Sequence, residues 1–217
     1  MARLTGRQIA DEELRGWAYL LGGLQTRIHT GDFAAGLAVV NAIGAAAKEM
    51  NHHPDLDLRY PHVDVRLTSH DEHGVTDRDV RLARTISSIA AGAGARLDSA
   101  NVSRLELALD TPAREKVLPF WAAVLAMEHR SEPEFGDELH DPADGLPTVW
   151  FQASGGEEPR QRWHPDIWVD LAQVQPRIDA ALAAGGTLVS DEEAPRFWVL
   201  ADPEGNRVCL CTSQDRD

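Results

Sequence analysis

Five histidines lie close together in the stretch NHHPDLDLRYPHVDVRLTSHDEHGVTDRD, residues 51–79. Imidazole has an unperturbed pKa of about 6.5, so it can donate or accept a proton near neutral pH, and it is also a common metal ligand. The stretch therefore predicts acid–base chemistry, a metal site or a polar surface. Its histidines are His52, His53, His62, His70 and His73.

The spacing of these histidines favours proton transfer over metal ligation. His52 and His53 are adjacent, so their rings point apart on a regular element, and no cysteine or helical histidine pair accompanies them. Both precede Pro54, in a connection between a predicted helix and strand where the backbone can present both rings. His70 ends the strand-like segment HVDVRLTSH, and Asp79 follows on the next helix. We predict an acid–base pocket in which the carboxylate orients one ring, and we expect the other two histidines of the stretch in solvent.

Asp79 also has a structural interpretation that the sequence leaves open. Thr76 and Asp79 stand three residues apart at the start of the predicted helix, as in a capping box with the shorter acid in place of glutamate. Val75 and Val80 would form the accompanying hydrophobic staple. The carboxylate could therefore serve the helix, the pocket, or both.

Hydrophobic periodicity in the first half predicts the elements that would hold this pocket. Helices are expected at residues 4–14, 32–51 and 76–93, two strands within 17–30, and further strands at 56–60 and 62–70. The expected buried residues of the second helix are Phe33, Leu37, Val40 and Ala47, behind Asp32 as N-cap. Those of the last strand are Val63, Val65 and Leu67. This order predicts an α+β domain with helices on one face of an antiparallel sheet.

The chain divides near GAGARLDSANVS, residues 92–103, where small residues follow a helical pattern. We expect one domain at residues 1–97, a linker at 98–103 and a second domain at 104–217. The second domain contains five of the six tryptophans, Trp121, Trp150, Trp163, Trp168 and Trp198. Its pattern predicts a strand–helix–strand–strand–strand unit that occurs twice and forms a cupped sheet.

Composition excludes several classes of function. The net charge of −14, with lysine and arginine scattered, argues against nucleic-acid binding. The first residues are too polar for a signal peptide, and no stretch of about 18 apolar residues is apparent, so we expect a cytoplasmic protein without membrane contact. Cys209 and Cys211 are two residues apart, a poor geometry for a disulfide, and we expect both to be reduced.

Residues 3–92 resemble the pterin-4a-carbinolamine dehydratase family. The resemblance rests on Lys48, HHP at 52–54, Tyr60, His70 and Asp79 at the family's spacing. In addition, TSHDEHGVTDRDVRLA, residues 68–83, resembles the family pattern T-H-D-x-x-G-[LV]-T-x-x-D-x-x-L-A. Lys48 is a departure, because glutamate is often found at this position in these enzymes.

The resemblance implies an enzyme that removes water from 4a-hydroxytetrahydropterin to give quinonoid dihydropterin, without metal or other cofactor. It implies that His52 and His70 form the acid–base pair and that His53 positions the pterin. It also implies that Asp79 orients or polarises a histidine ring. Tyr60 and Lys48 would belong to the substrate site. It also implies a homodimer or higher homo-oligomer.

Residues 104–213 resemble the vicinal oxygen chelate group, which includes glyoxalases and bleomycin-resistance proteins. The segments RWHPDIWVDL, ALAAGGTLV and VLADPEGNRVCL carry this resemblance. Metal ligands of the group would correspond to Glu106, His164 and Cys209, with cysteine where the group has glutamate. We favour a metal-free pocket that binds an organic molecule through tryptophans. As an alternative function, the second domain sequesters an aromatic ligand while the first serves dimerisation.

Overall fold

The structure is a computed structural model that describes residues 2–132, 136–154, 163–201 and 207–216. The chain folds into two compact units. The first comprises Met1–Ser103 with Val169–Gln173 and Thr212–Asp217, and the second comprises Arg104–Trp168 with Val174–Cys211.

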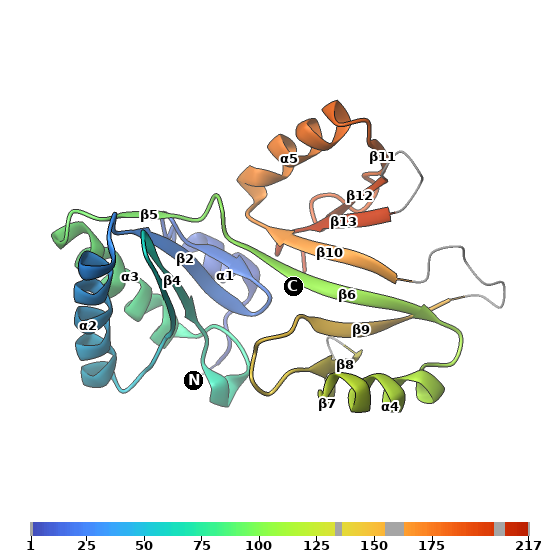
Figure 1. The fold of residues 1–217 in the computed structure, drawn as a ribbon, viewed down its shortest axis with the longest axis horizontal. Coiled ribbons are helices and arrows are strands. Elements are labelled where there is room, and N and C mark those ends of the chain that lie inside the picture. Colours follow the sequence, from blue (N-terminus) through green and yellow to red (C-terminus); the bar gives the residue numbers. More distant parts are fainter. Residues whose placement is uncertain (1, 133–135, 155–162, 202–206, 217) are drawn as a thin grey trace. The chain divides into compact units, whose positions relative to one another are not determined.

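The first unit is an antiparallel sheet with helices packed on it (Figure 1). The strands follow the order β1–β2–β4–β3, and β5 also pairs with β2. The elements in chain order are α1 (Gly6–Asp11), β1 (Ala18–Leu20), β2 (Gly23–His29), α2 (Phe33–Met50), β3 (Asp55–Arg59), β4 (His62–Leu67), the 3-10 helix η1 (His70–Glu72), α3 (Asp77–Gly92) and β5 (Arg96–Asp98). The predicted α+β architecture is confirmed.

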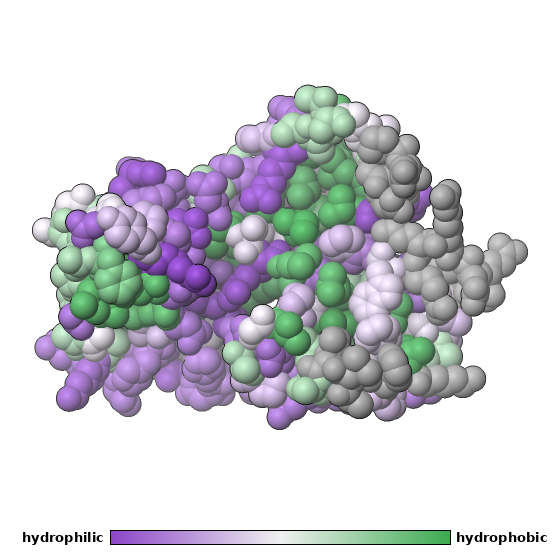
Figure 2. All heavy atoms as spheres, viewed as in Figure 1, coloured by the Kyte–Doolittle hydropathy of each residue, from purple (hydrophilic) through white to green (hydrophobic). Residues whose placement is uncertain are grey.

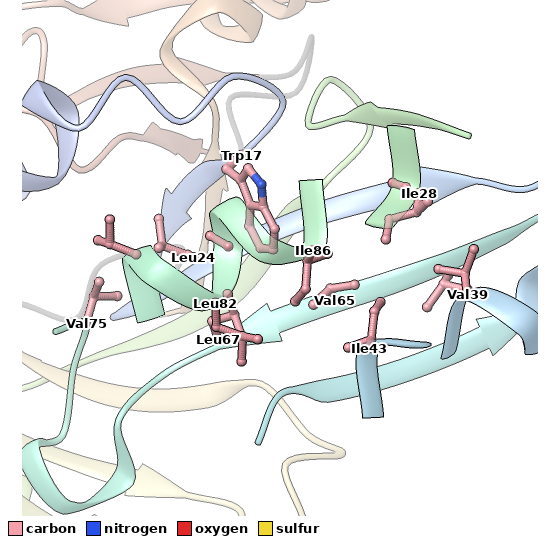
Figure 3. Close-up of a cluster of buried hydrophobic side chains, with 14 of the residues drawn as sticks. Trp17, Leu24, Ile28, Val39, Ile43, Val65, Leu67, Val75, Leu82 and Ile86 are labelled. Carbon is pink, nitrogen blue, oxygen red and sulfur yellow. The ribbon is translucent and has the colours of Figure 1, made fainter. Parts of the chain in front are cut away.

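The core of this unit lies between the sheet and the helices α2 and α3 (Figure 3). Alternate residues of β4, Val63, Val65 and Leu67, are at most 2% exposed, as their spacing predicts. Ile43 from α2 and Ile86 from α3 pack in the same cluster. The strand alternation therefore places one face of β4 in the core. The two ends of the β3–β4 pair are not part of this buried face and can carry functional side chains.

The predicted buried face of α2 is wrong at Phe33 and Leu37, whereas Val40 is half-buried against the core and Ala47 is buried. Phe33 and Leu37 are 47% and 45% exposed, and hydrophobic residues gather on the surface over this helix (Figure 2). The buried residues are Gly36, Val39, Ile43 and Ala47. Because α2 is apolar on most sides, its period does not distinguish the faces. A close approach of the backbone decides between them, since a Cβ on Gly36 would lie 2.7 Å from Leu58 Cδ1.

Helix α2 also meets the length and composition criteria for a membrane span, contrary to the sequence-based expectation. It has 18 residues and a mean hydropathy of 1.2. Core helices pass the same criteria, and Val39 and Ile43 of α2 are packed into the core of the first unit.

The stretch near which the chain is expected to divide, residues 92–103, contains the strand β5. Gly94, with φ +69°, follows the end of α3, and β5 then pairs antiparallel with β2, with Leu97 opposite Ile28. A three-residue strand is too short for its alternation to be recognised in sequence.

The second unit confirms the predicted duplication. Its strands follow the order β11–β12–β13–β10–β6–β9–β8–β7. In chain order they and their helices are β6 (Ser103–Thr111), α4 (Arg114–Leu125), β7 (Glu128–Glu132), β8 (Gly136–His140), β9 (Thr148–Ala153), β10 (Trp163–Val169), α5 (Leu171–Ala183), β11 (Thr187–Ser190), β12 (Phe197–Ala201) and β13 (Arg207–Cys211). In each copy the first strand pairs in parallel with the last, β6 with β9 and β10 with β13.

Candidate active site

The N-terminus of α3 is closed by a capping box. Thr76 is the N-cap, and its hydroxyl accepts a hydrogen bond from Arg78 N at 3.2 Å. In return, Asp79 Oδ2 accepts from Thr76 N at 2.8 Å. The structural interpretation of Asp79 is therefore confirmed, and its side chain is fully buried.

The same carboxylate also holds a histidine. Asp79 Oδ1 lies 2.7 Å from His52 Nε2, and Oδ2 accepts from Ser69 Oγ at 2.7 Å. An ionised carboxylate only accepts hydrogen bonds, so we assign the proton of neutral His52 to Nε2. Nδ1 then keeps its lone pair, which is the state of a general base.

Local structure explains why His52 is buried while its neighbour is not. Asn51 ends α2 in the left-handed conformation, with φ 47°, and the His52 backbone N–H returns to Ala47 O at 3.0 Å. This C-cap turns the His52 ring inward, where it is 7% exposed, while His53 is exposed. Lys48, in the last turn of α2, is also exposed.

His70 is positioned by the loop that follows β4. Ser69 and Gly74 form an isolated antiparallel bridge, and His70 opens η1 between them with its side chain exposed. The guanidinium of Arg78 donates to Asp71 next to His70, and this hydrogen bond lowers the pKa of the Asp71 carboxyl. The loop that presents His70 is therefore tied to α3.

The strand pairing brings the histidines to one end of the β3–β4 pair. Asp55 lies opposite Arg66, so His52 and His53, just before β3, and His70, just after β4, share that end. Asp79 joins the two sides, because it contacts both His52 and the residue before His70. Tyr60 is different: it is 69% exposed in the turn at the opposite end, so the structure does not bring it to the histidines.

Ser69 is a site residue that the sequence analysis missed. It is 1% exposed, and its hydroxyl contacts both Asp79 Oδ2 and Thr76 Oγ1. The signal was present, because Ser69 extends the parity of the buried β4 residues by one step. A polar side chain at a core position needs a partner.

In the second unit the structure gathers two of the three candidate metal ligands with a different third. His164 and Cys209 lie beside Asp166, whereas Glu106 accepts a hydrogen bond from Trp168 Nε1 at 2.7 Å. The parallel pairing of β10 and β13 explains the exchange, because it sets Asp166 opposite Cys209. His164 precedes Asp166 by two residues and therefore shares its face of β10.

Residues 2–89 match the family model of pterin 4 alpha carbinolamine dehydratase. A "Putative pterin-4-alpha-carbinolamine dehydratase" of Herpetosiphon aurantiacus is 41% identical over 86 residues, which are 40% of this chain and 90% of that protein. The protein of the same name from Aquifex aeolicus is 37% identical over 78 residues, 36% of this chain and 79% of that protein. The chain belongs to the pterin-4a-carbinolamine dehydratase family.

A second family model, the glyoxalase-like domain, matches residues 106–211. Among solved structures, a transcriptional coactivator/pterin dehydratase from Brucella melitensis is 29% identical, with 41% of this chain and 98% of that chain covered and a TM-score of 0.40. A glyoxalase/bleomycin resistance protein/dioxygenase superfamily member from Vibrio splendidus 12B01 is 16% identical, with 51% and 99% covered and a TM-score of 0.37. The chain thus joins a dehydratase-family part to a glyoxalase-like part, as the sequence resemblances predict.

Proposed function

We propose that the first unit catalyses the dehydration of 4a-hydroxytetrahydropterin. The proton on N5 is removed, the hydroxyl on C4a leaves as water after protonation, and a double bond forms between C4a and N5. The reaction is neutral overall and needs no redox partner. The observation that carries this proposal is the buried pair of His52 and Asp79 beside the exposed imidazoles of His53 and His70.

The geometry suggests how the base and acid roles divide between the imidazoles of His52 and His70. His52 is held by Asp79 through Nε2, so its Nδ1 lone pair is available to take the N5 proton. His70 is exposed at the same end of the sheet and, when protonated, can give its proton to the departing hydroxyl. His53 would contact the pterin, and exposed Lys48 would set the charge beside it. Positioned proton transfer of this kind contributes about 10² to 10⁴ in rate.

A kinetic assay with a matched pair of variants tests this proposal. The 4a-hydroxytetrahydropterin would be generated by an aromatic amino-acid hydroxylase, and its decay followed with and without the purified chain. We expect wild type to accelerate the decay and His70→Ala to abolish the acceleration. His73→Asn is the control, because His73 is exposed in the same loop and asparagine tolerates its φ of 50°. Equal loss of the acceleration in both variants, or no acceleration by wild type, would contradict the proposed dehydratase activity and the role of His70 in it.

We also propose self-association through α2. Its exposed apolar residues, Phe33 and Leu37, form a surface that a second copy could cover. The outer strand β3 is less suited, because Asp55, Asp57 and Arg59 are exposed along it and charged edges discourage strand pairing. Light scattering on wild type and Leu37→Asp tests this, with dissociation expected in the variant.

For the second unit we propose binding of a small aromatic ligand as the alternative function. Trp150 on β9 and Trp168 on β10 each anchor the indole N–H on a carboxylate, Asp166 and Glu106 respectively. The half-buried indole of Trp150 therefore offers a fixed apolar face, whereas Trp168 is buried. Quenching of tryptophan fluorescence by an added ligand without turnover would support binding, and the absence of quenching across aromatic ligand classes would contradict it.

A further inference from the structure

A buried hydroxyl joins the two sides of the proposed dehydratase site. Ser69 follows β4, one residue before His70, and is 1% exposed. Its Oγ donates a hydrogen bond to Asp79 Oδ2 at 2.7 Å. The other oxygen of the same carboxylate, Oδ1, lies 2.7 Å from His52 Nε2. A continuous path of contacts therefore runs from the residue before His70 to the ring of His52.

The backbone of Ser69 is held as firmly as its side chain. Its N–H donates to Gly74 O at 2.9 Å. Its carbonyl oxygen accepts from Glu72 N at 3.1 Å and from Gly74 N at 3.4 Å. These hydrogen bonds close the loop that contains η1. His70 is the first residue of η1, so its exposed side chain extends from a fixed point of the backbone.

The hydroxyl of Ser69 takes part in more than one hydrogen bond. It donates to Asp79 Oδ2, so its oxygen can accept the proton of Thr76 Oγ1, which lies 2.8 Å away. Thr76 Oγ1 in turn accepts from Arg78 N at 3.2 Å. Each hydroxyl thus both donates and accepts. A methyl group at position 69 would remove two hydrogen bonds of this buried network at once.

Loss of the hydroxyl should displace the carboxylate rather than unfold the loop. Thr76 Oγ1 lies 3.2 Å from Asp79 Oδ2, so its proton could turn to that oxygen. The capping bond from Thr76 N at 2.8 Å would also remain. The carboxylate would then be held from the Thr76 side alone, and its Oδ1 would no longer be fixed beside His52. Catalysis is sensitive to such shifts, because a misplacement of about 1 Å can cost about 100-fold in rate.

We propose that Ser69 is a positioning residue of the dehydratase site, which acts on His52 through Asp79 and on His70 through the loop backbone. Its buried side chain does not itself contact the pterin. The inference rests on the proposed dehydratase function. Loss of the hydroxyl should lower kcat, because both imidazoles lose their alignment. It should leave KM nearly unchanged, because the side chains proposed to contact the pterin are still present.

A series of substitutions at position 69 tests the proposal in the 4a-hydroxytetrahydropterin decay assay. Ser69→Ala should lower kcat about 10- to 100-fold while KM changes by less than about threefold. Ser69→Cys, whose thiol is a weak donor, should lose less. Ser69→Thr keeps the hydroxyl, and the extended backbone with φ −89° and ψ 100° suits a β-branched residue. This conservative variant should recover most of the kcat that Ser69→Ala loses.

The matched control removes a hydroxyl of the same unit away from the histidines. Ser87 Oγ accepts from Trp17 Nε1 at 3.0 Å and donates to Ala83 O at 2.9 Å. Ser87→Ala therefore also disrupts two hydrogen bonds, and it should keep kcat within about threefold of wild type. Circular dichroism would verify that each variant is folded. Equal kcat losses in Ser69→Ala and Ser87→Ala, or in Ser69→Ala and Ser69→Thr, would overturn the proposal.

Two measurements without substrate separate this proposal from the dehydratase assignment. The Nε2 proton of His52, held between the ring and a carboxylate, should give a downfield ¹H NMR signal in wild type and Ser87→Ala that is lost in Ser69→Ala. Hydrogen exchange at the amides of Ser69 and Gly74 should be faster in Ser69→Ala alone. An unchanged signal and unchanged exchange in Ser69→Ala would overturn the positioning role. If wild type lacks activity, the dehydratase proposal fails, and these two measurements still decide whether Ser69 holds His52.

Discussion

Replacement of Asp79 by asparagine separates the two roles of this side chain. The amide has the shape of the carboxylate but offers one oxygen and one NH₂ group. The oxygen can still accept from Thr76 N and Ser69 Oγ, so the capping geometry survives. The NH₂ group then faces His52 Nε2, which must accept instead of donate. The variant therefore reverses the tautomer of His52 and moves the lone pair away from Nδ1.

The cost to stability follows from the hydrogen bonds around the carboxylate. Hydrogen bonds to a charged group contribute about 1.5–3 kcal/mol and neutral ones about 0.5–1.5 kcal/mol. Three close donors, Thr76 N, Ser69 Oγ and His52 Nε2, surround Asp79. Loss of the charge should therefore lower the free energy of unfolding of the first unit by about 2–3 kcal/mol. Asp77→Asn, at an exposed position of the same first turn, should cost only about 0.3–1 kcal/mol.

The cost to catalysis should be larger than stability alone accounts for. If His52 is the base, loss of its Nδ1 lone pair should lower kcat by about 10² to 10⁴ with a smaller change in KM. The tautomer is visible directly, because the ¹⁵N shifts of the His52 ring differ between the two protonated forms. Hydrogen exchange of peptides from α3 gives the free energy of opening of this unit without interference from the other.

One combination of results would refute the reasoning. An Asp79→Asn variant that loses stability as expected but retains kcat within about threefold would reduce Asp79 to a capping residue. An unchanged His52 tautomer in that variant would refute the assignment of the proton to Nε2.

Three further predictions concern the fold. Ile43→Ala should lower the free energy of unfolding of the first unit by about 2–5 kcal/mol. Leu37→Ala, on the exposed side of α2, should change it by about 0.5 kcal/mol or less in dilute monomer. Equal effects of the two variants in urea titrations would contradict the observed helix face. Trp17→Phe removes the 3.0 Å hydrogen bond from Nε1 to Ser87 Oγ and should cost about 0.5–1.5 kcal/mol in the same titrations, with no loss if the bond is absent in solution. The backbone N–H groups of residues 143, 146 and 145 hold the pKa of Asp141 below its ordinary value. The turn at residues 141–146 is therefore fully stabilised above about pH 3.9 and loosens as the pH falls through the lower folded-state pKa. A carboxyl carbon shift of Asp141 that titrates at or above about pH 3.9 would contradict this.

Features that depend on neighbouring residues in the chain could be predicted from the sequence. The capping box of Thr76 and Asp79 and the buried alternation of β4 are set within a few residues, and both are confirmed. The order of elements and the duplicated second unit follow from the same local patterns.

Features that depend on how distant segments meet could not be predicted. The face of α2 is chosen by Gly36 against Leu58, a contact between a helix and a strand. The inclusion of Asp166 in place of Glu106 depends on the register of β10 against β13. The contact between His52 and Asp79 depends on the left-handed turn at Asn51, which directs the His52 ring inward.

The shared duty of Asp79 affects how relatives of this chain should be judged. A relative that does not process pterins would still be selected to retain Asp79, since loss of its charge would lower the free energy of unfolding of the first unit. Retention of that acid is consequently a poor marker of activity. The solvent-facing rings at 53 and 70 are better markers, because a chain that no longer used them could discard them at little cost to its architecture.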